Sequence, residues 1–255
     1  MHNEVSDPSG ALRIALATPE YVMIPKTIHY CWFGKAPMSD LNKRCIDSWR
    51  RVMPDYQIKE WNETNSPLDN AYSQTAYGKE LWSKLSNLVR LQALYTEGGI
   101  YFDTDVEVIK SFVPLLHHNC FVGFQVEEEQ VDWVTNGVLG AQPGHPFLKR
   151  CIELTRELFA VTGKFYRSPT ITTMILKEMG LKEYGLQEID EVTIYPLEYF
   201  YPYPWTSKFS PDCVKENTYS IHYWEGTWLK KEHSKVLSPL RMVKRMMRTL
   251  ISKVD

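Results

Sequence analysis

The segment EGGIYFDTDVEVIK, from Glu97 to Lys110, contains the strongest structural signal in the chain. Two glycines precede an apolar run, and Asp103 and Asp105 then interrupt an alternation that Val106 and Val108 continue. Strands are depleted in aspartate, so two carboxylates one residue apart at the end of a strand indicate a function. In open α/β sheets, ligands bind at the edge where such strands end.

The residues before this segment predict an α/β fold. We expect a buried strand over residues 26–34 and a second strand over 56–61. Between them, Ser39 is a suitable N-cap for a helix over 39–53. This β-α-β order is typical of a parallel sheet with crossover helices. Further helices and strands are expected over 78–99, 120–126, 133–141, 145–163, 168–180 and 218–229.

Length and composition are those of one large domain with short appendages. The chain has 255 residues, of which 44% are hydrophobic, enough for a substantial core. A formal net charge of −2 argues against a general nucleic-acid binder. We expect a flexible N-terminal arm over 1–22 without the pattern of a secretory signal, a main domain over 23–233 and a basic amphipathic helix over 234–255.

The cysteines predict a reduced, cytoplasmic protein. None of them forms a CxxC pair, and their number is odd. Free thiols are therefore expected in preference to disulfides or a thiolate metal site. The five are Cys31, Cys45, Cys120, Cys151 and Cys213.

The C-terminal tail predicts a helix that lies on a membrane surface. Apolar residues from Leu240 to Val254 share one arc of a helical wheel, and the opposite arc carries Arg241, Lys244, Arg245 and Arg248. Each basic residue near an anionic bilayer contributes about 1 kcal/mol. No apolar run reaches the ~20 residues of a membrane span, so we expect peripheral contact with the inner face of the cell membrane. The alternative is a terminal helix that packs on the domain and exposes its basic face.

The acidic pair predicts a divalent cation that holds a diphosphate. Two neighbouring carboxylates repel each other unless a cation lies between them. Oxygen ligands suit Mg²⁺ or Mn²⁺, which also bind phosphates. On the preceding helix, which is apolar nearly all round, Arg90 needs a partner if it is buried. That partner is either an internal carboxylate or a ligand anion or hydroxyl.

A second class of enzyme also places Asp-x-Asp after an apolar strand. Phosphatases and mutases of the haloacid-dehalogenase type have Thr or Val at the fifth position of this motif, near the N-terminus. Here the fifth position is Glu107, and the motif lies about 100 residues into the chain. A phosphohydrolase acting on simple phosphate esters is therefore disfavoured.

Four segments, taken in order, resemble one known family. They are IPKTIHYCWFG (24–34), SNLVRLQALYTEGGIYFDTDVEV (86–108), GHPFL (144–148) and YSIHYWEGTWL (219–229). Together they are similar to the DXD-containing sugar transferases of glycosyltransferase family 32, which include bacterial capsular polysaccharide transferases and fungal mannosyltransferases and are related to glucosylating toxins. The resemblance implies a GT-A fold with a Rossmann-like mixed sheet. It also implies sugar transfer, with retention, from a nucleotide diphosphate sugar (UDP in preference to GDP) to a glycan or lipid-linked acceptor in surface polysaccharide synthesis.

The same resemblance implies a metal site and its residues. Asp105 would bind Mn²⁺ or Mg²⁺ directly, and Asp103 would contact the donor ribose and the metal shell. His222 matches a position that binds the metal or a phosphate. Arg90 and the indole N–H of Trp228 would donate hydrogen bonds that strengthen as charge develops on the leaving diphosphate.

Other residues are implied to bind the donor. Trp32 would lie against the nucleobase, Asn87 and Arg90 would bind sugar hydroxyls and phosphate, and Thr227 with Trp228 would close over the diphosphate. Two of these depart from the family pattern: it usually has Asp at Asn87 and Ser at Thr227. The loss of charge at Asn87 leaves a second hypothesis open, a non-catalytic protein of the same fold that binds nucleotide sugars or glycans.

The residues do not identify a catalytic nucleophile. The acidic run Glu127 to Glu129 is typical of a solvated loop, so we expect front-side attack by the acceptor without a protein nucleophile. Asn136 is a candidate to face the donor sugar. His29 is expected to be a hydrogen-bonded core residue and His145 a helix cap. For YFYPYPW (199–205), an acceptor groove and a rigid loop are equally compatible with the sequence.

Overall fold

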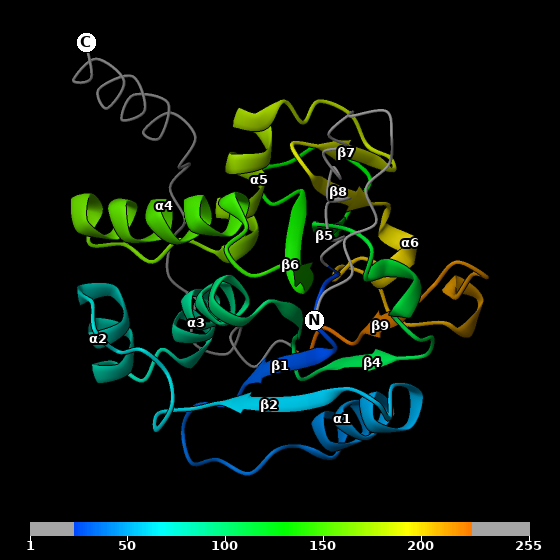
Figure 1. Cartoon of the computed structure of the whole chain (residues 1–255), viewed down its shortest axis with the longest axis horizontal. Helices are drawn as coiled ribbons and strands as arrows, with labels where there is room; N and C mark the ends of the chain where they lie inside the picture. Colours follow the sequence, from blue (N-terminus) through cyan, green and yellow to red (C-terminus); the bar gives the residue numbers. More distant parts are fainter. Residues whose placement is uncertain (1–22, 226–255) are drawn as a thin grey trace, which may run out of the picture.

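The computed structural model describes residues 23–225, so the arm predicted over 1–22 and the helix predicted over 234–255 lie outside it. The strands of its main sheet are β1 (Thr27–Cys31), β2 (Gln57–Trp61), β3 (Gly99–Phe102), β5 (Cys120–Phe124), β6 (Val134–Ala141), β7 (Gln187–Ile189) and β8 (Val192–Tyr195). Their order is β2-β1-β3-β6-β5-β8-β7 (Figure 1). β1 is parallel to β2 and β3, whereas β6 is antiparallel to β3 and β5. The predicted mixed α/β sheet is confirmed.

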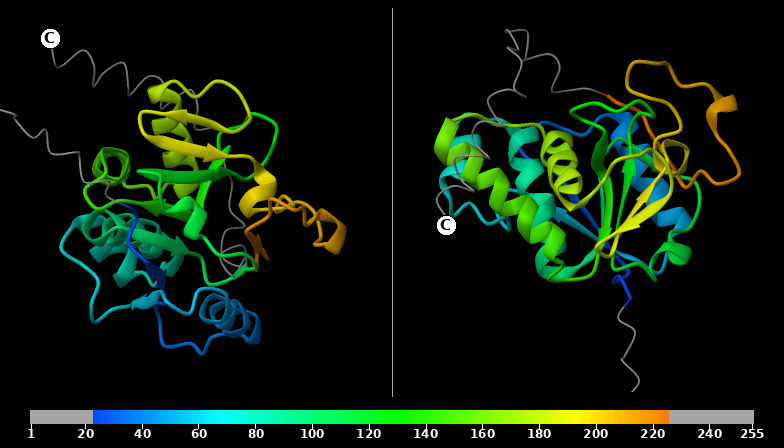
Figure 2. Two further views of the ribbon diagram at one scale, coloured as in Figure 1. Left: turned by 45° about the vertical axis from the view of Figure 1, so that its right-hand side comes forward. Right: turned by 90° about the horizontal axis from the view of Figure 1, so that it is seen from above.

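Helices cover both faces of this sheet, as the view from above in Figure 2 shows. One hydrophobic cluster lies under α2 (Ala71–Gly78), α3 (Trp82–Glu97), α4 (Pro146–Thr162) and α5 (Ser168–Met179). The other cluster lies under α1 (Asp40–Val52), α6 (Leu197–Phe200) and the antiparallel pair β4 (Val106–Val108) and β9 (Ser220–His222). Short 3₁₀ turns lie at Val113–Leu115 and Pro211–Cys213. Within residues 23–225, no helix has the length and apolar content needed to cross a bilayer.

The α1 helix forms as the sequence predicts. Ser39 is its N-cap, and the Ser39 hydroxyl accepts a hydrogen bond from the backbone N–H of Asn42. On the apolar face, the fully buried Trp49 donates its indole N–H to the carbonyl of Val106 at 2.7 Å. This bond joins α1 to β4, the strand that follows the acidic pair.

The double glycine before β3 is required by backbone conformation and by space. Gly98 ends α3 with φ +66°, and Gly99 follows with φ +104°, a region that L side chains avoid. A Cβ on Gly99 would stand 2.5 Å from the carbonyl oxygen of Thr27. Any other residue at Gly99 would therefore push β3 away from β1.

The acidic pair lies at the junction of the two sheets. β3 belongs to the seven-stranded sheet and β4 to the two-stranded sheet, and a turn closed by the hydrogen bond from Val106 N to Asp103 O joins them. The predicted strand, break and strand are thus confirmed, with the second strand in a different sheet. Asp103 directly follows the last residue of β3, and Asp105 directly precedes the first residue of β4.

One helix was not predicted from the sequence, whereas the expectations for the cysteines and for His145 agree with the structure. Residues 71–78 form α2, which the apolar pattern did not predict, because this helix is short and buries few side chains. All five cysteines are free, and four of them are buried, which agrees with the expectation of reduced thiols. The predicted helix cap at His145 is confirmed, since its Nδ1 accepts a hydrogen bond from Phe147 N.

His29 is a buried, hydrogen-bonded core residue, as the sequence predicts. Its Nδ1 accepts the indole N–H of Trp61 at 3.0 Å, so its Nε2 carries the proton and donates to the carbonyl of Gly98 at 2.8 Å. The ring is therefore neutral in the folded protein. Burial lowers the pKa of His29 below its ordinary value of 6.5.

This arrangement predicts a pH-dependent stability. Because the unfolded chain binds a proton at His29 more tightly than the folded chain, the stabilisation is complete above pH 6.5 and is lost as the pH falls below that value. We expect His29→Gln, which keeps a donor toward Gly98, to lose less unfolding free energy than wild type between about pH 7 and about pH 5. Urea unfolding at both pH values measures this difference, with the exposed His117→Gln as matched control. Equal losses in wild type and His29→Gln would contradict the assignment.

Candidate active site

Arg90 and Asp103 form an ion pair at the carboxyl end of β3. Arg90 Nη2 lies 2.9 Å from Asp103 Oδ1, and Nη1 lies 3.3 Å from Oδ2, so the guanidinium binds both carboxylate oxygens. The side chain of Arg90 is 6% exposed and that of Asp103 is 26% exposed. Burial opposes the charge of Arg90, but the Asp103 carboxylate outweighs it, and the pKa of Arg90 is raised. Arg90 thus has the internal partner expected of a buried cation, and this partner stays partly open to a ligand.

Tyr101 orients this ion pair from the same face of β3. It is two residues before Asp103, so both side chains point to one side of the strand. The Tyr101 hydroxyl donates to Asp103 Oδ1 at 3.1 Å, and the Arg90 guanidinium lies 4.4 Å from the centre of the Tyr101 ring. The sequence reasoning missed Tyr101, although its two-residue spacing from Asp103 was a usable signal.

Asn136, on β6, binds Arg90 and not an open site. Its carbonyl and its Oδ1 accept from Arg90 Nη1 at 3.0 and 3.3 Å. Oδ1 also accepts the hydroxyl of Ser168, and Nδ2 donates to Thr172, both on α5. The residue is 1% exposed. The expectation that Asn136 faces the donor sugar is therefore not supported, because its polar atoms connect Arg90 to α5.

Asp105 pairs with His222, which β9 brings beside it. His222 Nε2 lies 3.0 Å from Asp105 Oδ1, and Asp105 Oδ2 accepts the backbone N–H of Glu225 at 2.8 Å. Burial disfavours both charges, but each group stabilises the other more strongly. The pKa of Asp105 is therefore lowered and that of His222 raised. The prediction that His222 belongs to this site is supported by this contact.

Trp224 covers His222 and was not predicted from the sequence. Its ring centre lies 3.9 Å from that of His222, and its indole N–H donates to the carbonyl of Tyr203 at 3.0 Å. Trp224 has φ +52°, an unfavourable conformation for a tryptophan that these contacts maintain. Asn42 on α1 completes the enclosure, since its side chain donates to the Glu225 carboxylate at 2.9 Å.

The two ion pairs converge at Gly137. A Cβ on this residue would stand 2.8 Å from Asp103 Oδ2 and 3.3 Å from His222 Cε1. Only glycine therefore leaves space between the two side chains. His222 Nδ1 is buried there and has no hydrogen-bond partner among residues 23–225. Charged, this nitrogen would donate to a phosphate oxygen; neutral, it would bind a cation.

The chemistry of these side chains fits the predicted Mn²⁺ or Mg²⁺. Asp103 and Asp105 would supply oxygen ligands to such an ion, and the unpartnered Nδ1 of a neutral His222 would be a further ligand. In the part of the chain that the structure describes, no three His, Cys, Asp or Glu side chains are grouped closely enough to hold an ion. A cation here would therefore bind one or two carboxylates and complete its shell with phosphate oxygens, as Mg²⁺ commonly does.

The other residues that were singled out in the sequence do not belong to the two ion pairs. Asn87 is partly buried on α3, and its side chain makes no hydrogen bond within residues 23–225. Trp32 follows β1, and its indole N–H donates to the carbonyl of Ala36. Thr227 and Trp228 lie outside the described residues. The run Glu127 to Glu129 is exposed, as predicted for a solvated loop.

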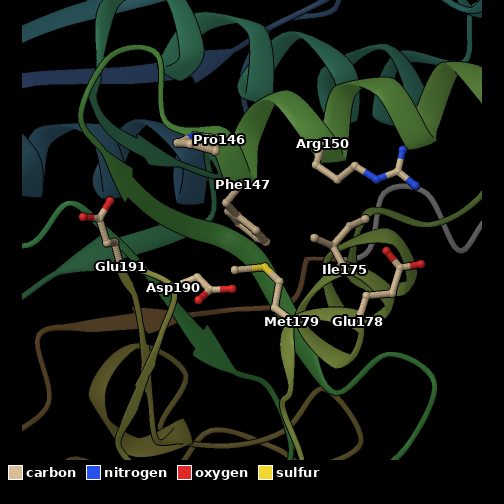
Figure 3. Close-up of a pocket in the computed structure, with 8 residues that line it drawn as sticks. All are labelled: Pro146, Phe147, Arg150, Ile175, Glu178, Met179, Asp190 and Glu191. Atoms are coloured by element: carbon tan, nitrogen blue, oxygen red, sulfur yellow. The ribbon is translucent and has the colours of Figure 1, made fainter.

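A separate cavity of about 470 Å³ lies between α4, α5 and the turn from β7 to β8. Figure 3 shows Phe147, Ile175 and Met179 inside it, with Arg150 and Glu178 at one end. None of the residues that line it belongs to the two ion pairs. The candidate site is therefore defined by its side-chain chemistry and not by this cavity.

Two family models match the chain. Residues 39–122 match the glycosyltransferase sugar-binding region containing the DXD motif, and residues 140–249 match the alpha 1,4-glycosyltransferase conserved region. The first range contains both Asp103 and Asp105, and the second contains His222. The predicted resemblance to sugar transferases of family 32 is confirmed.

Individual proteins show the same similarity. The chain is 31% identical to inositol phosphoceramide mannosyltransferase 3 of Schizosaccharomyces pombe, over 59% of this chain and 41% of that protein. It is 28% identical to the lactosylceramide 4-alpha-galactosyltransferase of Mus musculus, over 69% of this chain and 52% of that protein. The chain thus spans about half the length of these curated relatives.

A solved structure shows the same fold. The glycosyltransferase PaToxG superposes with a TM-score of 0.50 at 18% identity, over 61% of this chain and 70% of that chain. At this identity the likeness concerns the fold alone. The predicted GT-A class is confirmed.

The contacts of Asn136 predict a loss of stability on truncation. Asn136→Ala removes the hydrogen bonds to Ser168 and Thr172 and one acceptor for Arg90, and it leaves buried polar groups unpaired. We expect a loss of about 1–3 kcal/mol in unfolding free energy by urea denaturation. Gln130→Ala, which also truncates an amide side chain but at an exposed position, is the control and should stay within about 0.5 kcal/mol of wild type. An Asn136→Ala protein as stable as the control would show that the network contributes nothing.

Proposed function

We propose that this chain, which carries both sugar-transferase regions, is a glycosyltransferase that moves a sugar from a nucleotide diphosphate donor to a glycan or glycolipid acceptor. The observation that carries the proposal is the separate pairing of Asp103 with Arg90 and of Asp105 with His222 around Gly137. The Asp103 carboxylate and the His222 ring meet at this glycine, and the Asp105 carboxylate lies directly behind His222, an arrangement that suits a diphosphate and its cation. The names of the relatives, a mannosyltransferase and a galactosyltransferase, support the same reaction class.

The residues of the chain have distinct tasks in this proposal. Arg90 fixes the orientation of Asp103 through two hydrogen bonds, and Asn136 fixes Arg90. His222 holds Asp105, while the Trp224 ring covers His222. A divalent cation bound at the two carboxylates would stabilise the charge that develops on the leaving diphosphate. Exclusion of water strengthens these electrostatic interactions and limits hydrolysis of the donor.

The donor and the stereochemistry are further parts of the proposal. We propose UDP in preference to GDP, because the segments that resemble the family also resemble the glucosylating toxins. Retention by front-side attack is consistent with the exposure of Glu127 to Glu129, since Glu129 pairs with Lys177 on the surface and not with the site. For the acceptor, the relatives are named for ceramide glycolipids. A lipid-linked glycan, as in surface polysaccharide synthesis, is compatible with the same chemistry.

Asn87 supports the second hypothesis, a non-catalytic protein that binds nucleotide sugars or glycans. Asn87, where the family usually has Asp, has no hydrogen-bond partner within residues 23–225 and lacks the charge of a carboxylate. A non-catalytic protein that binds nucleotide sugars or glycans would tolerate this change. Hydrolysis or transfer of the donor sugar discriminates between the two functions.

The proposed reaction depends on the charge of Asp105. Asp105→Asn keeps the size of the side chain but removes the anion that pairs with His222 and would bind the cation. We expect donor turnover to fall at least about a hundredfold, measured as UDP release from UDP-glucose and UDP-galactose with Mn²⁺. A chelator should have the same effect on wild type. Asp69→Asn, in an exposed loop, is the control. Unchanged turnover in Asp105→Asn, with or without the chelator, would exclude the proposed mechanism.

We also propose that residues 240–255 bring the protein to an anionic membrane surface on the cytoplasmic side. The support is the sequence pattern alone, with four basic residues opposite an apolar arc. Deletion of 240–255 is expected to abolish co-sedimentation with vesicles that contain phosphatidylserine, because each lost basic residue removes about 1 kcal/mol. Neutral phosphatidylcholine vesicles are the control. Undiminished co-sedimentation of the shortened chain would contradict the proposal.

A further inference from the structure

Two aromatic side chains project from the loop between α6 and β9. Trp205 is 44% exposed and Phe209 is 38% exposed, and within residues 23–225 no other Trp or Phe reaches this exposure. Both views in Figure 2 show this segment standing out from the body of the molecule. We call residues 201–216 the aromatic loop. Two large exposed rings on one short segment make it a candidate surface for binding a partner.

The aromatic loop is held in place at its base. Tyr201, Pro202 and Tyr203 are buried, and the Tyr201 hydroxyl accepts the backbone N–H of Val138 at 2.7 Å. The hydrogen bond from Ser207 N to Pro204 O closes a turn next to Trp205. Proline restricts the backbone of the loop further. Trp205 and Phe209 are therefore presented by a fixed backbone, which lowers the entropy cost of binding.

Contacts join the aromatic loop to the candidate active site. The Phe209 ring packs 5.7 Å from the rings of both Tyr203 and Tyr223. The backbone N–H of Tyr223 donates to the carbonyl of Asp105, and the carbonyl of Tyr203 accepts the indole N–H of Trp224. The loop thus lies directly against the segment that encloses Asp105 and His222. A molecule bound to the loop would lie beside the reacting groups.

The charge of the aromatic loop favours a sugar over a lipid surface. Between 201 and 216 the charged residues are Lys208, Asp212, Lys215 and Glu216, so the segment has no net charge. An anionic bilayer attracts basic segments and would gain nothing from this one. Sugar rings have an apolar C–H face and polar edges. An exposed aromatic face surrounded by polar groups complements both.

We propose that the aromatic loop is the acceptor-binding surface, and that Trp205 and Phe209 bind the apolar face of a sugar ring in the acceptor glycan. The proposal rests on the proposed glycosyltransferase function, because an acceptor exists only for a transferase. It identifies the acceptor as a carbohydrate bound by its ring, whatever lipid or chain carries that ring. It also assigns a role to the segment 199–205, for which the sequence left an acceptor groove and a rigid loop equally open.

The test separates acceptor binding from donor chemistry. Full-length Trp205→Ala, Trp205→Tyr and Phe209→Ala are compared with Tyr77→Ala, an aromatic residue on α2 that is 42% exposed. Binding to an immobilised panel of neutral oligosaccharides that includes lactose measures the affinity of the aromatic loop for glycans. Release of UDP from UDP-glucose and UDP-galactose with Mn²⁺, with water as acceptor, measures the rate of donor hydrolysis at the candidate active site. Co-sedimentation with phosphatidylserine vesicles measures any lipid contact.

We expect glycan binding to weaken about tenfold in Trp205→Ala and in Phe209→Ala, because each loses one stacked ring. Trp205→Tyr should restore most of the binding, and Tyr77→Ala should match wild type. Donor hydrolysis should be unchanged in Trp205→Ala, which also shows that this variant is folded. Because Phe209 packs against Tyr203 and Tyr223, the result for Trp205 decides the test.

Three results would overturn the proposal. These are equal glycan binding by wild type and Trp205→Ala, no glycan binding by wild type, and loss of vesicle binding in Trp205→Ala with glycan binding intact. Failure of the proposed function has a different signature. If no variant and no wild-type sample hydrolyses a donor, the transferase assignment fails, while Trp205-dependent glycan binding would still support a carbohydrate-binding loop.

Discussion

The repulsion between two carboxylates one residue apart is the constraint on which the site depends. The fold meets it by giving each carboxylate its own partner from a different part of the chain, Arg90 for Asp103 and His222 for Asp105. This division requires the chain to leave the seven-stranded sheet at Asp103 and to begin the two-stranded sheet after Asp105. The acidic pair therefore lies in the segment that joins the two sheets, and the separation of its two carboxylates depends on that junction.

Because these ion pairs are buried, their stability depends on the contacts that surround them. Removal of one partner from a buried ion pair commonly costs about 3–5 kcal/mol, because the other charge remains without compensation. The network from α5 through Asn136 to Arg90 therefore positions Asp103 without touching a ligand. On the other side, Trp224 keeps an unfavourable backbone conformation to cover His222. Both arrangements retain charge in the small volume of the candidate site.

Much of the fold follows from local signals. The alternation along β3, the cap at Ser39 and the double glycine each predict their element, because each depends on neighbours within a few residues. The short helix α2 escaped prediction, because it buries few side chains and has no apolar stripe. Within the site, the sequence indicated the acidic pair, Arg90 and His222 through motifs. It did not indicate Trp224 or the contacts of Asn136, which have no motif of their own.

The sequence by itself determined where the strands end, which residues are acidic there, and that a buried Arg90 needs an anion. Only the tertiary structure decided which groups meet. Asn136 reaches Arg90 across 46 residues, and His222 reaches Asp105 across 117 residues. These contacts follow from the antiparallel register of β6 with β3 and of β9 with β4. Strand register depends on the packing of the whole sheet, and local propensity does not specify it.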